Sequence, residues 1–341
     1  MMAAAPSSKC PPAVVPAALS SPPRRLRCRC CEDTLGVPRR RASPPQLRAF
    51  PELQLLHQHQ QQAEEPPLRP RRIVLLRHGE SEGNVDEAAY TRVPDPQIGL
   101  TAKGWRDADD CGRRLRDLFS SDSDDWKVYF YVSPYRRTLE TLRGMGRAFE
   151  TNRIAGVREE PRLREQDFGN FQDREQMRLE KQIRRRYGRF FYRFPNGESA
   201  ADVYDRITGF RETLRGDIDT GFRGTRRTRG DMNIVLVSHG LTLRVFLMRW
   251  YKWTVRQFEG LRNLANGGAL VMQLGQGGRY SLLVHHTADE LRDFGFTDDM
   301  LQDQMWEKTA EPGDVNYAFM TNGQEFFDPF TSLHHPSSEL S

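Results

Sequence analysis

Cysteine, long apolar segments and acids near the amino terminus are scarce in this sequence of 341 residues. Four of the five cysteines lie before residue 32, which leaves Cys111 alone in the remainder. This distribution excludes a disulfide framework and is typical of a protein from a reducing compartment. No apolar run approaches the ~20 residues that a helix needs to cross a bilayer, so the sequence predicts no membrane association.

An excess of basic charge is also missing from most of the chain, although the whole sequence has a net charge of +5. Residues 1–72 hold 12 Lys and Arg against 5 Asp and Glu, which leaves 39 against 41 for the rest, a net charge of −2. A domain that binds nucleic acid normally concentrates basic residues on one face. The charge of residues 73–341 therefore argues against nucleic acid as a partner.

The first 70 residues differ in composition from the rest and are predicted to form a disordered leader. They are rich in Ala, Pro, Ser and Arg, and the first acid is Glu32. This composition is typical of a transit peptide for a chloroplast or another organelle. A disordered tail that targets nothing, on a cytoplasmic protein, is an equal alternative. A single domain is predicted over residues 71–290, followed by a partly disordered tail at 291–341.

Two apolar runs, each followed by a histidine and a glycine, dominate the predicted domain. Residues 73–76 (I-V-L-L) precede Arg77 and His78, and residues 233–237 (N-I-V-L-V) end shortly before His239. Short runs rich in branched apolar residues are typical of strands buried on both faces of a parallel sheet. Ligands bind at the carboxyl edge of such sheets. We therefore expect both imidazoles in one crevice at that edge.

Helices and strands alternate along residues 71–290, which predicts an α/β fold. Thr101 is a helix cap by residue type, and Ser199 with Asp202 matches a capping box that opens a second helix. Pro134 suits the first turn of a third helix, which carries Arg137. The other elements are strands predicted at 128–132, 269–274 and 280–284 and helices predicted at 173–187 and 243–250.

The residue types at the strand ends suit phosphoryl transfer. A neutral imidazole can attack phosphorus near physiological pH. Arginine holds two phosphoryl oxygens at once and does not deprotonate, which counters the negative charge of a phosphate monoester. Arg77 is adjacent to His78, and His239 can add a further donor. Arg137 lies in the first turn of a helix whose amides also favour an anion.

Four segments together resemble the motifs of the histidine phosphatase superfamily, which includes the cofactor-dependent phosphoglycerate mutases. They are R-H-G-E-S-E-G-N at 77–84, S-P-Y-R-R-T-L-E-T at 133–141, L-R-E-Q-D-F-G at 163–169 and V-S-H-G at 237–240, in the family's order. The resemblance implies a three-layer α/β/α fold with a mostly parallel central sheet. It leaves out the leader and the predicted tail.

The resemblance also implies roles for individual residues. His78 is the implied nucleophile, and Glu165 is the implied acid that protonates the leaving oxygen and then draws a proton from water. The implied phosphoryl and substrate ligands are Arg77, Asn84, Arg137, His239 and Gly240. No cofactor and no metal ion are implied. His285 and His286 are predicted at a strand end with side chains on opposite faces, where they make a poor metal pair.

The loop around Glu165 bears on two activities that share one phosphoenzyme. In the mutases an arginine, an aromatic or histidine, and a tyrosine follow the glutamate and help to grip a carboxylate. Here Gln166, Asp167 and Phe168 follow it, which favours a phosphatase of small phosphorylated metabolites. A mutase is the alternative, because the basic helix at 178–189 could bind a second anionic group. A solvated basic helix face is the competing interpretation.

A regulatory or binding protein on an inactivated phosphatase fold is a further alternative. Such a protein would have lost part of its catalytic set, and the residues His78, Arg137, Glu165 and His239 are all present. The expected partner is a small phosphorylated substrate, and a homodimer is compatible with the sequence.

Overall fold

A computed structural model describes residues 69–169, 173–222 and 232–316 of the chain. The predicted leader, up to residue 68, and the end of the predicted tail, after residue 316, lie outside these ranges. The central feature of the described residues is a mixed sheet with the strand order β3-β2-β4-β1-β5-β6. Its parallel part comprises β1 (Arg72–Arg77), β2 (Lys127–Val132), β3 (Ile154–Glu159) and β4 (Met232–Ser238), and its antiparallel part β5 (Ala269–Leu274) and β6 (Tyr280–Ser281).

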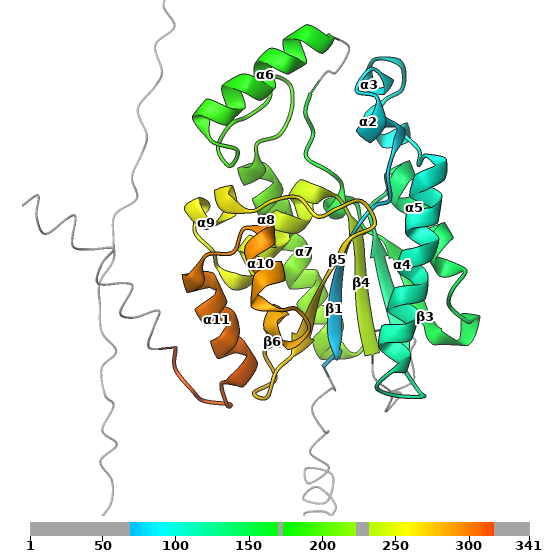
Figure 1. Ribbon diagram of the computed structural model, residues 1–341, viewed down its shortest axis with the longest axis vertical. Helices are drawn as coiled ribbons and strands as arrows, with labels where there is room; N and C mark the ends of the chain where they lie inside the picture. Colours follow the sequence, from blue (N-terminus) through cyan, green and yellow to red (C-terminus); the bar gives the residue numbers. More distant parts are fainter. Residues whose placement is uncertain (1–68, 170–172, 223–231, 317–341) are drawn as a thin grey trace, which may run out of the picture. The chain divides into compact units, whose positions relative to one another are not determined.

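Strand β1 shows why helices cover both faces of this sheet. Its four central residues are fully buried, and neighbours along a strand point to opposite faces. Ile73 and Leu75 join a core cluster with α7 (Ala200–Thr220) and α8 (Gly240–Tyr251). Val74 and Leu76 join another with α4 (Ala102–Ser120) and α5 (Arg136–Gly146). The predicted three-layer α/β/α architecture with a mostly parallel sheet is confirmed (Figure 1).

The predicted helix starts follow their capping residues. Thr101 accepts a hydrogen bond from the Gly104 amide at 3.0 Å, and Ser199 with Asp202 forms the expected capping box of α7. The remaining helices are α2 (Glu82–Val85), α3 (Ala89–Arg92), α6 (Arg174–Tyr187), α9 (Val255–Gly260), α10 (Ala288–Phe294) and α11 (Asp298–Thr309), with 3-10 turns at Asp95–Gln97, Thr151–Arg153, Pro161–Leu163 and Leu282–Val284.

Two local predictions are wrong. Helix α5 begins at Arg136, so Pro134 precedes it, and the Thr138 hydroxyl donates to the Tyr135 carbonyl oxygen to close the turn. The last strand ends at Ser281, because the buried Gln304 side chain accepts from the Leu282 amide at 2.8 Å and the chain turns away as a 3-10 helix. His285 and His286 therefore follow this turn rather than a strand. Their ring centroids lie 4.8 Å apart.

The predicted domain limit at residue 290 also needs correction. Helices α10 and α11 continue to Thr309, and Leu291, Phe294 and Met300 belong to the same core cluster as α7 and α8. These helices are short, and charged residues interrupt their apolar positions, so the periodic signal in the sequence was weak. The structured part therefore includes residues that were expected to form a tail.

Candidate active site

The four parallel strands bring the predicted site residues to one edge of the sheet. His78 follows β1 and His239 follows β4, and the His78 amide donates to the Ser238 carbonyl oxygen at 3.0 Å. Ser133 follows β2, and its amide donates to the Val237 carbonyl oxygen at 3.0 Å. Glu165 lies in the loop after β3. Because parallel strands end on the same side, residues far apart in sequence become neighbours here.

His78 and His239 lie next to each other in the interior. Their ring centroids are 5.2 Å apart at an interplanar angle of 61°, and the residues are 3% and 0% exposed. His78 Nδ1 lies 2.7 Å from the Gly79 carbonyl oxygen, so Nδ1 carries the proton and Nε2 keeps its lone pair. Burial, and then Arg137 and Arg77, lower the pKa of His78 well below its ordinary value. The ring is therefore neutral at physiological pH.

One ring nitrogen of His239 has no hydrogen-bond partner within the described part of the chain. Its Nε2 lies 2.8 Å from the Ser133 hydroxyl, whereas its buried Nδ1 forms no hydrogen bond. Burial, then Arg137 and His78, lower the pKa of His239 as well. When the Ser133 hydroxyl donates its hydrogen bond to Nε2 of the neutral ring, Nε2 is the acceptor and the ring proton lies on Nδ1. That tautomer presents an unused N–H donor.

Among the residues that the structure describes, no carboxylate forms an ion pair with Arg77. Its Nη1 donates to the Leu264 carbonyl oxygen at 2.6 Å, and its buried Nε forms no hydrogen bond. Burial lowers the pKa of Arg77, the Glu165 carboxylate opposes that shift, and Arg137 adds to it. Gly240 allows this packing, since a Cβ there would lie 2.5 Å from Asn263 Oδ1 and 3.6 Å from Arg77 Nε.

Arg137, in contrast, is held by an acid that the sequence did not point to. Its Nη1 donates to both the backbone oxygen and Oδ1 of Asp95, each at 2.8 Å. Burial raises the pKa of Asp95, although Arg137 opposes that shift. The Tyr135 ring centroid lies 4.9 Å from the guanidinium carbon and 5.1 Å from the His239 ring. Arg137 is thus fixed in place beside the histidines.

Glu165 is positioned through its own backbone and a neighbouring hydroxyl. Glu165 Oε1 accepts from the Gln166 amide at 3.0 Å and lies 3.2 Å from the Thr242 hydroxyl on α8. Arg206 on α7 donates to the Glu165 carbonyl oxygen at 3.1 Å and binds both carboxylate oxygens of Glu198. These contacts hold the loop beside the histidine that opens α8.

Asn84, a predicted phosphoryl ligand, uses its side-chain oxygen for contacts within the protein. Asn84 is exposed, and its Oδ1 accepts from the Ser81 amide at 3.1 Å and from Asn266 Nδ2 at 2.6 Å. This oxygen serves as the capping acceptor of α2. Gly79, in the same motif, allows close packing, because a Cβ there would lie 2.4 Å from the Gly104 carbonyl oxygen.

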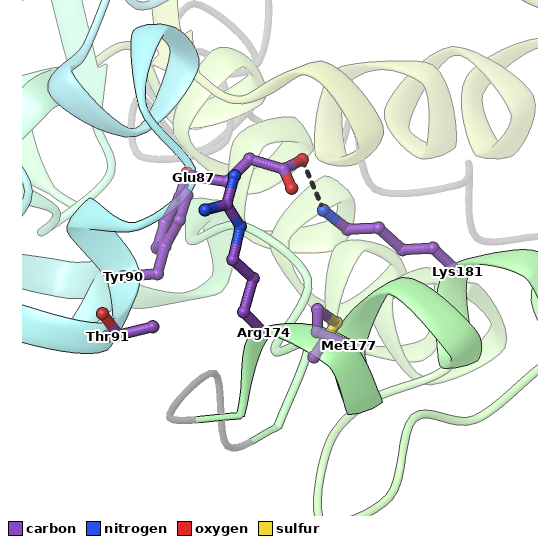
Figure 2. Close-up of a pocket in the computed structure, with 6 residues that line it drawn as sticks. All are labelled: Glu87, Tyr90, Thr91, Arg174, Met177 and Lys181. Atoms are coloured by element: carbon purple, nitrogen blue, oxygen red, sulfur yellow. Dashed lines mark hydrogen bonds and ion pairs between the residues drawn. The ribbon is translucent and has the colours of Figure 1, made fainter.

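Helix α6 lies beyond the carboxyl edge of the sheet, across from α2 and α3 (Figure 1). The two sides meet around a hollow lined by Glu87, Tyr90, Thr91, Arg174, Met177 and Lys181 (Figure 2). Lys181 Nζ and Glu87 Oε1 form an ion pair at 2.8 Å across it. Burial raises the pKa of Tyr90 to about 12, with smaller influences from Arg137, Asp95 and Glu165.

Several residues that position the site could not be predicted from the sequence. They are Asp95, Ser133 as the partner of His239, Glu198, Arg206 and Thr242. Only Ser133 carried a signal, since it begins the S-P-Y-R-R motif. Among the described residues, no group of three or more His, Cys, Asp or Glu side chains is placed to hold a metal ion. None of the helices described is both long and apolar enough to span a membrane.

Comparisons with known proteins identify the family of this chain. The profile of the histidine phosphatase superfamily, branch 1, matches residues 73–287. The phosphoglycerate mutase-like protein AT74 of Arabidopsis thaliana is 55% identical over 263 residues, covering 76% of this chain and 83% of that protein. The related AT74H of the same plant is 51% identical over 245 residues, covering 70% and 87%.

A third relative is named for its activity. The broad-range acid phosphatase DET1 of Saccharomyces cerevisiae is 34% identical over 291 residues, covering 60% of this chain and 86% of that protein. The match of the profile over more than half of the sequence, together with these relatives, establishes the family. The chain belongs to branch 1 of the histidine phosphatase superfamily.

Proposed function

We propose that the protein hydrolyses phosphomonoesters of small metabolites through a phosphohistidine at His78, without a metal ion. The observation that carries the proposal is the pair of buried, neutral imidazoles 5.2 Å apart. Beside them, Arg77 Nε and His239 Nδ1 are buried nitrogen atoms with no hydrogen-bond partner. Buried polar atoms are normally paired, so unused donors around a neutral nucleophile suit an anionic ligand.

In the first step, His78 Nε2 attacks phosphorus while the bond from phosphorus to the ester oxygen breaks. The phosphate does not repel this nucleophile electrostatically, because the attacking ring is neutral. Arg77, Arg137 and His239 Nδ1 would donate to the three equatorial oxygens, whose charge must be stabilised during transfer. Glu165, in its protonated form, gives its proton to the departing alkoxide, and the alcohol leaves.

In the second step, water attacks the phosphohistidine. Glu165, now a carboxylate, takes one proton from the water as the new phosphorus–oxygen bond forms and the phosphorus–nitrogen bond breaks. Inorganic phosphate leaves, and His78 regains its neutral form. The Thr242 hydroxyl and the Gln166 amide, both on Glu165 Oε1, would keep the carboxyl group oriented in both steps.

Hydrolysis rather than mutase chemistry is supported by the loop after Glu165. Gln166 replaces the cation of the mutases, and its side chain is buried with Nε2 donating to the Glu198 carbonyl oxygen at 2.8 Å. It therefore serves the loop itself. The acid phosphatase among the relatives supports the same choice. A coupled assay with strong bisphosphoglycerate-dependent interconversion of the phosphoglycerates would reverse it.

The phosphoenzyme gives the direct test. The full chain is incubated with a labelled phosphomonoester, quenched in alkali, and the alkali-stable, acid-labile label is counted. We expect His78→Ala to abolish the label and to lower kcat by on the order of 10⁴-fold or more. His285→Ala, at an exposed histidine away from the site, is the matched control. Equal labelling of His78→Ala and the parent would refute the proposal.

A further inference from the structure

Helix α6 exposes a row of large apolar side chains. Among the described residues, eight large apolar side chains are at least 41% exposed, and four of these eight lie within residues 179–191. They are Leu179 at 49%, Ile183 at 41%, Tyr187 at 68% and Phe191 at 61%. Residues four apart lie on one face of a helix, so Leu179, Ile183 and Tyr187 form a continuous stripe, here called the α6 stripe. Phe191 follows the end of the helix.

The other side of α6 is fixed against the rest of the protein. Met177 and Glu180 are buried, and the Tyr192 hydroxyl donates to the Glu180 carboxylate. Lys181 forms its ion pair with Glu87 at 2.8 Å. These contacts determine which face of the helix points outward, so the α6 stripe is exposed as a consequence of the fold. Contiguous apolar patches on a protein surface commonly mark a site of interaction.

Basic charge is concentrated in the same segment. Residues 174–193 contain eight Lys and Arg against two Glu, a net charge of +6, whereas residues 73–341 together have a net charge of −2. The exposed arginines of the helix are Arg174, Arg178, Arg185 and Arg186. Arg178 lies 3.6 Å from Glu175, whereas Arg185 and Arg186 form no ion pair among the described residues. An excess of positive charge therefore accompanies the α6 stripe in a domain that is otherwise acidic.

The arrangement of these side chains around α6 suits an anionic lipid surface. Arg178 and Arg185 are seven residues apart, about two helical turns, and therefore lie on the same flank of the stripe. Arg186 lies three residues after Ile183, at the border of the stripe. Apolar and aromatic side chains on one face, with arginines beside them, are typical of helices that lie at the headgroup boundary of a membrane. A second copy of this chain fits less well, because the same arginines would face one another.

We propose that α6 docks the protein on the surface of a membrane that contains anionic lipids. The α6 stripe enters the boundary between headgroups and acyl chains, and the guanidinium groups of Arg178, Arg185 and Arg186 reach the headgroups over their aliphatic stems. The expectation of no membrane association rested on the lack of a spanning run, which a helix on the surface does not need. Because α6 lies beyond the carboxyl edge of the sheet, docking holds this edge close to the lipid (Figure 1). The inference does not depend on the proposed hydrolysis.

Cosedimentation of the full chain with lipid vesicles tests the docking. Vesicles of phosphatidylcholine alone are compared with mixed vesicles of phosphatidylcholine and phosphatidylserine. We expect the parent to bind the mixed vesicles at least about tenfold more strongly, because each arginine near an anionic surface contributes to binding. This preference should weaken as the salt concentration rises. Equal binding to both kinds of vesicle would overturn the proposal, and so would no binding to either, which would favour an acidic protein as the partner of this face.

A charge variant connects this binding to α6. Arg185→Gln combined with Arg186→Gln should lower the affinity for mixed vesicles by about 10- to 30-fold. The matched control is Arg106→Gln combined with Arg143→Gln, which removes two exposed arginines from α4 and α5 that also form no ion pair among the described residues. Residues 1–72, with a net charge of +7, are present in every protein compared, so a difference between the variants reports α6. Equal affinities of the two variants would assign the binding to another part of the chain and overturn the proposal.

An apolar variant tests the contribution of the α6 stripe itself. Leu179→Gln should lower the affinity for mixed vesicles by about 3- to 10-fold, because less apolar surface is removed from water on binding. Met305→Gln is the matched control, since Met305 lies on α11 and is 48% exposed against 49% for Leu179. Both side chains are exposed, so both variants should unfold at the temperature of the parent. Unchanged affinity of Leu179→Gln, or an equal loss in Met305→Gln, would show that the stripe does not enter the lipid and would overturn the proposal.

Discussion

Each end of strand β1 carries an arginine, and the two arginines differ in their partners. At the amino end, Arg72 is 2% exposed and its guanidinium bonds to Gln273 Oε1 at 2.9 Å and forms an ion pair with Asp122. At the carboxyl end, Arg77 reaches the Leu264 carbonyl oxygen, and its buried Nε has no partner. Four residues of one strand lie between a cation with an ion pair and a cation that forms none among the described residues.

This difference separates a structural role from a functional role. Burying a charge without a partner costs free energy, so a fold retains such a charge only where ligand binding or catalysis depends on it. The unused donors of Arg77 and His239 lie together at the carboxyl edge, where ligands bind in parallel sheets. Arg72 lies at the opposite edge, where its partners come from the chain itself. The position along the strand, rather than the residue type, indicates function.

Replacement of Arg77 should give the largest effect of this comparison. Arg77→Gln removes a donor to the transferred phosphoryl group, and we expect kcat/KM to fall by about 10²- to 10³-fold. The free energy of unfolding should change by less than about 1 kcal/mol, because Arg77 is only partly buried and forms no ion pair among the described residues. Steady-state kinetics and urea unfolding of the same preparation measure both. A large loss of stability with little loss of activity would contradict a functional role for Arg77.

Replacement of Arg72 should show the reverse. Arg72→Gln leaves Asp122 and Gln273 without their partner, and we expect the free energy of unfolding to fall by about 1–3 kcal/mol. The expected loss is modest because the Asp122 side chain is partly exposed, at 23%. The folded variant should retain the kcat/KM of the parent. A selective loss of activity at unchanged stability would place Arg72 in the site after all.

The sequence predicted the parts of the fold that depend on local patterns. The buried strands before His78 and His239, the cap at Thr101 and the capping box at Ser199 each leave a signal within a few residues. The pairing of the two histidines also followed, because buried strands of one parallel sheet end at the same edge. Local pattern and sheet geometry were sufficient for these features.

Contacts between distant segments could not be predicted in this way. Asp95 reaches Arg137 across 42 positions, and Arg206 reaches the Glu165 carbonyl oxygen across 41. Neither residue type is unusual at its place in the sequence. The helices after residue 287 were missed for a related reason, since their apolar side chains complete a core built mainly by α7 and α8. Tertiary packing, rather than periodicity, determines these elements.

The buried histidines at the carboxyl edge should make stability depend on pH. The pKa of His78 is lowered in the folded state, so below its ordinary value of 6.5 the unfolded chain binds the proton first. Stability is therefore full above pH 6.5 and falls as the pH drops from there toward the folded pKa. Each such histidine contributes up to about 1.4 kcal/mol per pH unit.

Unfolding in urea at pH 7.0 and pH 5.5 checks this dependence. His239 and His286 also have lowered pKa values and contribute to the slope of the parent, so the comparison with one variant isolates His78. We expect His78→Gln to lose less stability than the parent between the two pH values. Parallel losses in the two proteins would mean that His78 is already protonated or accessible in the folded state.

The smallest expected effect concerns the acid beside Arg137. Asp95→Asn keeps an oxygen that can accept from Arg137 Nη1 but removes a negative charge from the neighbourhood of the phosphoryl group. We expect the inhibition constant of inorganic phosphate to fall by about 3- to 10-fold near neutral pH. Asp86→Asn, at an exposed carboxylate paired with Arg92, is the control on the same segment and should leave the constant unchanged.

The pKa of Asp95 determines the pH range in which the parent and Asp95→Asn should bind phosphate differently. Burial raises the pKa of Asp95, with Glu165 and Asp167 acting in the same direction and Arg137 against it. As the pH falls through this pKa, the parent loses the competing charge and its phosphate inhibition constant should approach that of Asp95→Asn. The two proteins should therefore differ most above the titration and converge below it. Weaker phosphate binding by Asp95→Asn at every pH would instead mean that the carboxylate is needed to orient Arg137. The Arg137–Asp95 pair would then have the same structural role as the Arg72–Asp122 pair at the amino end of β1.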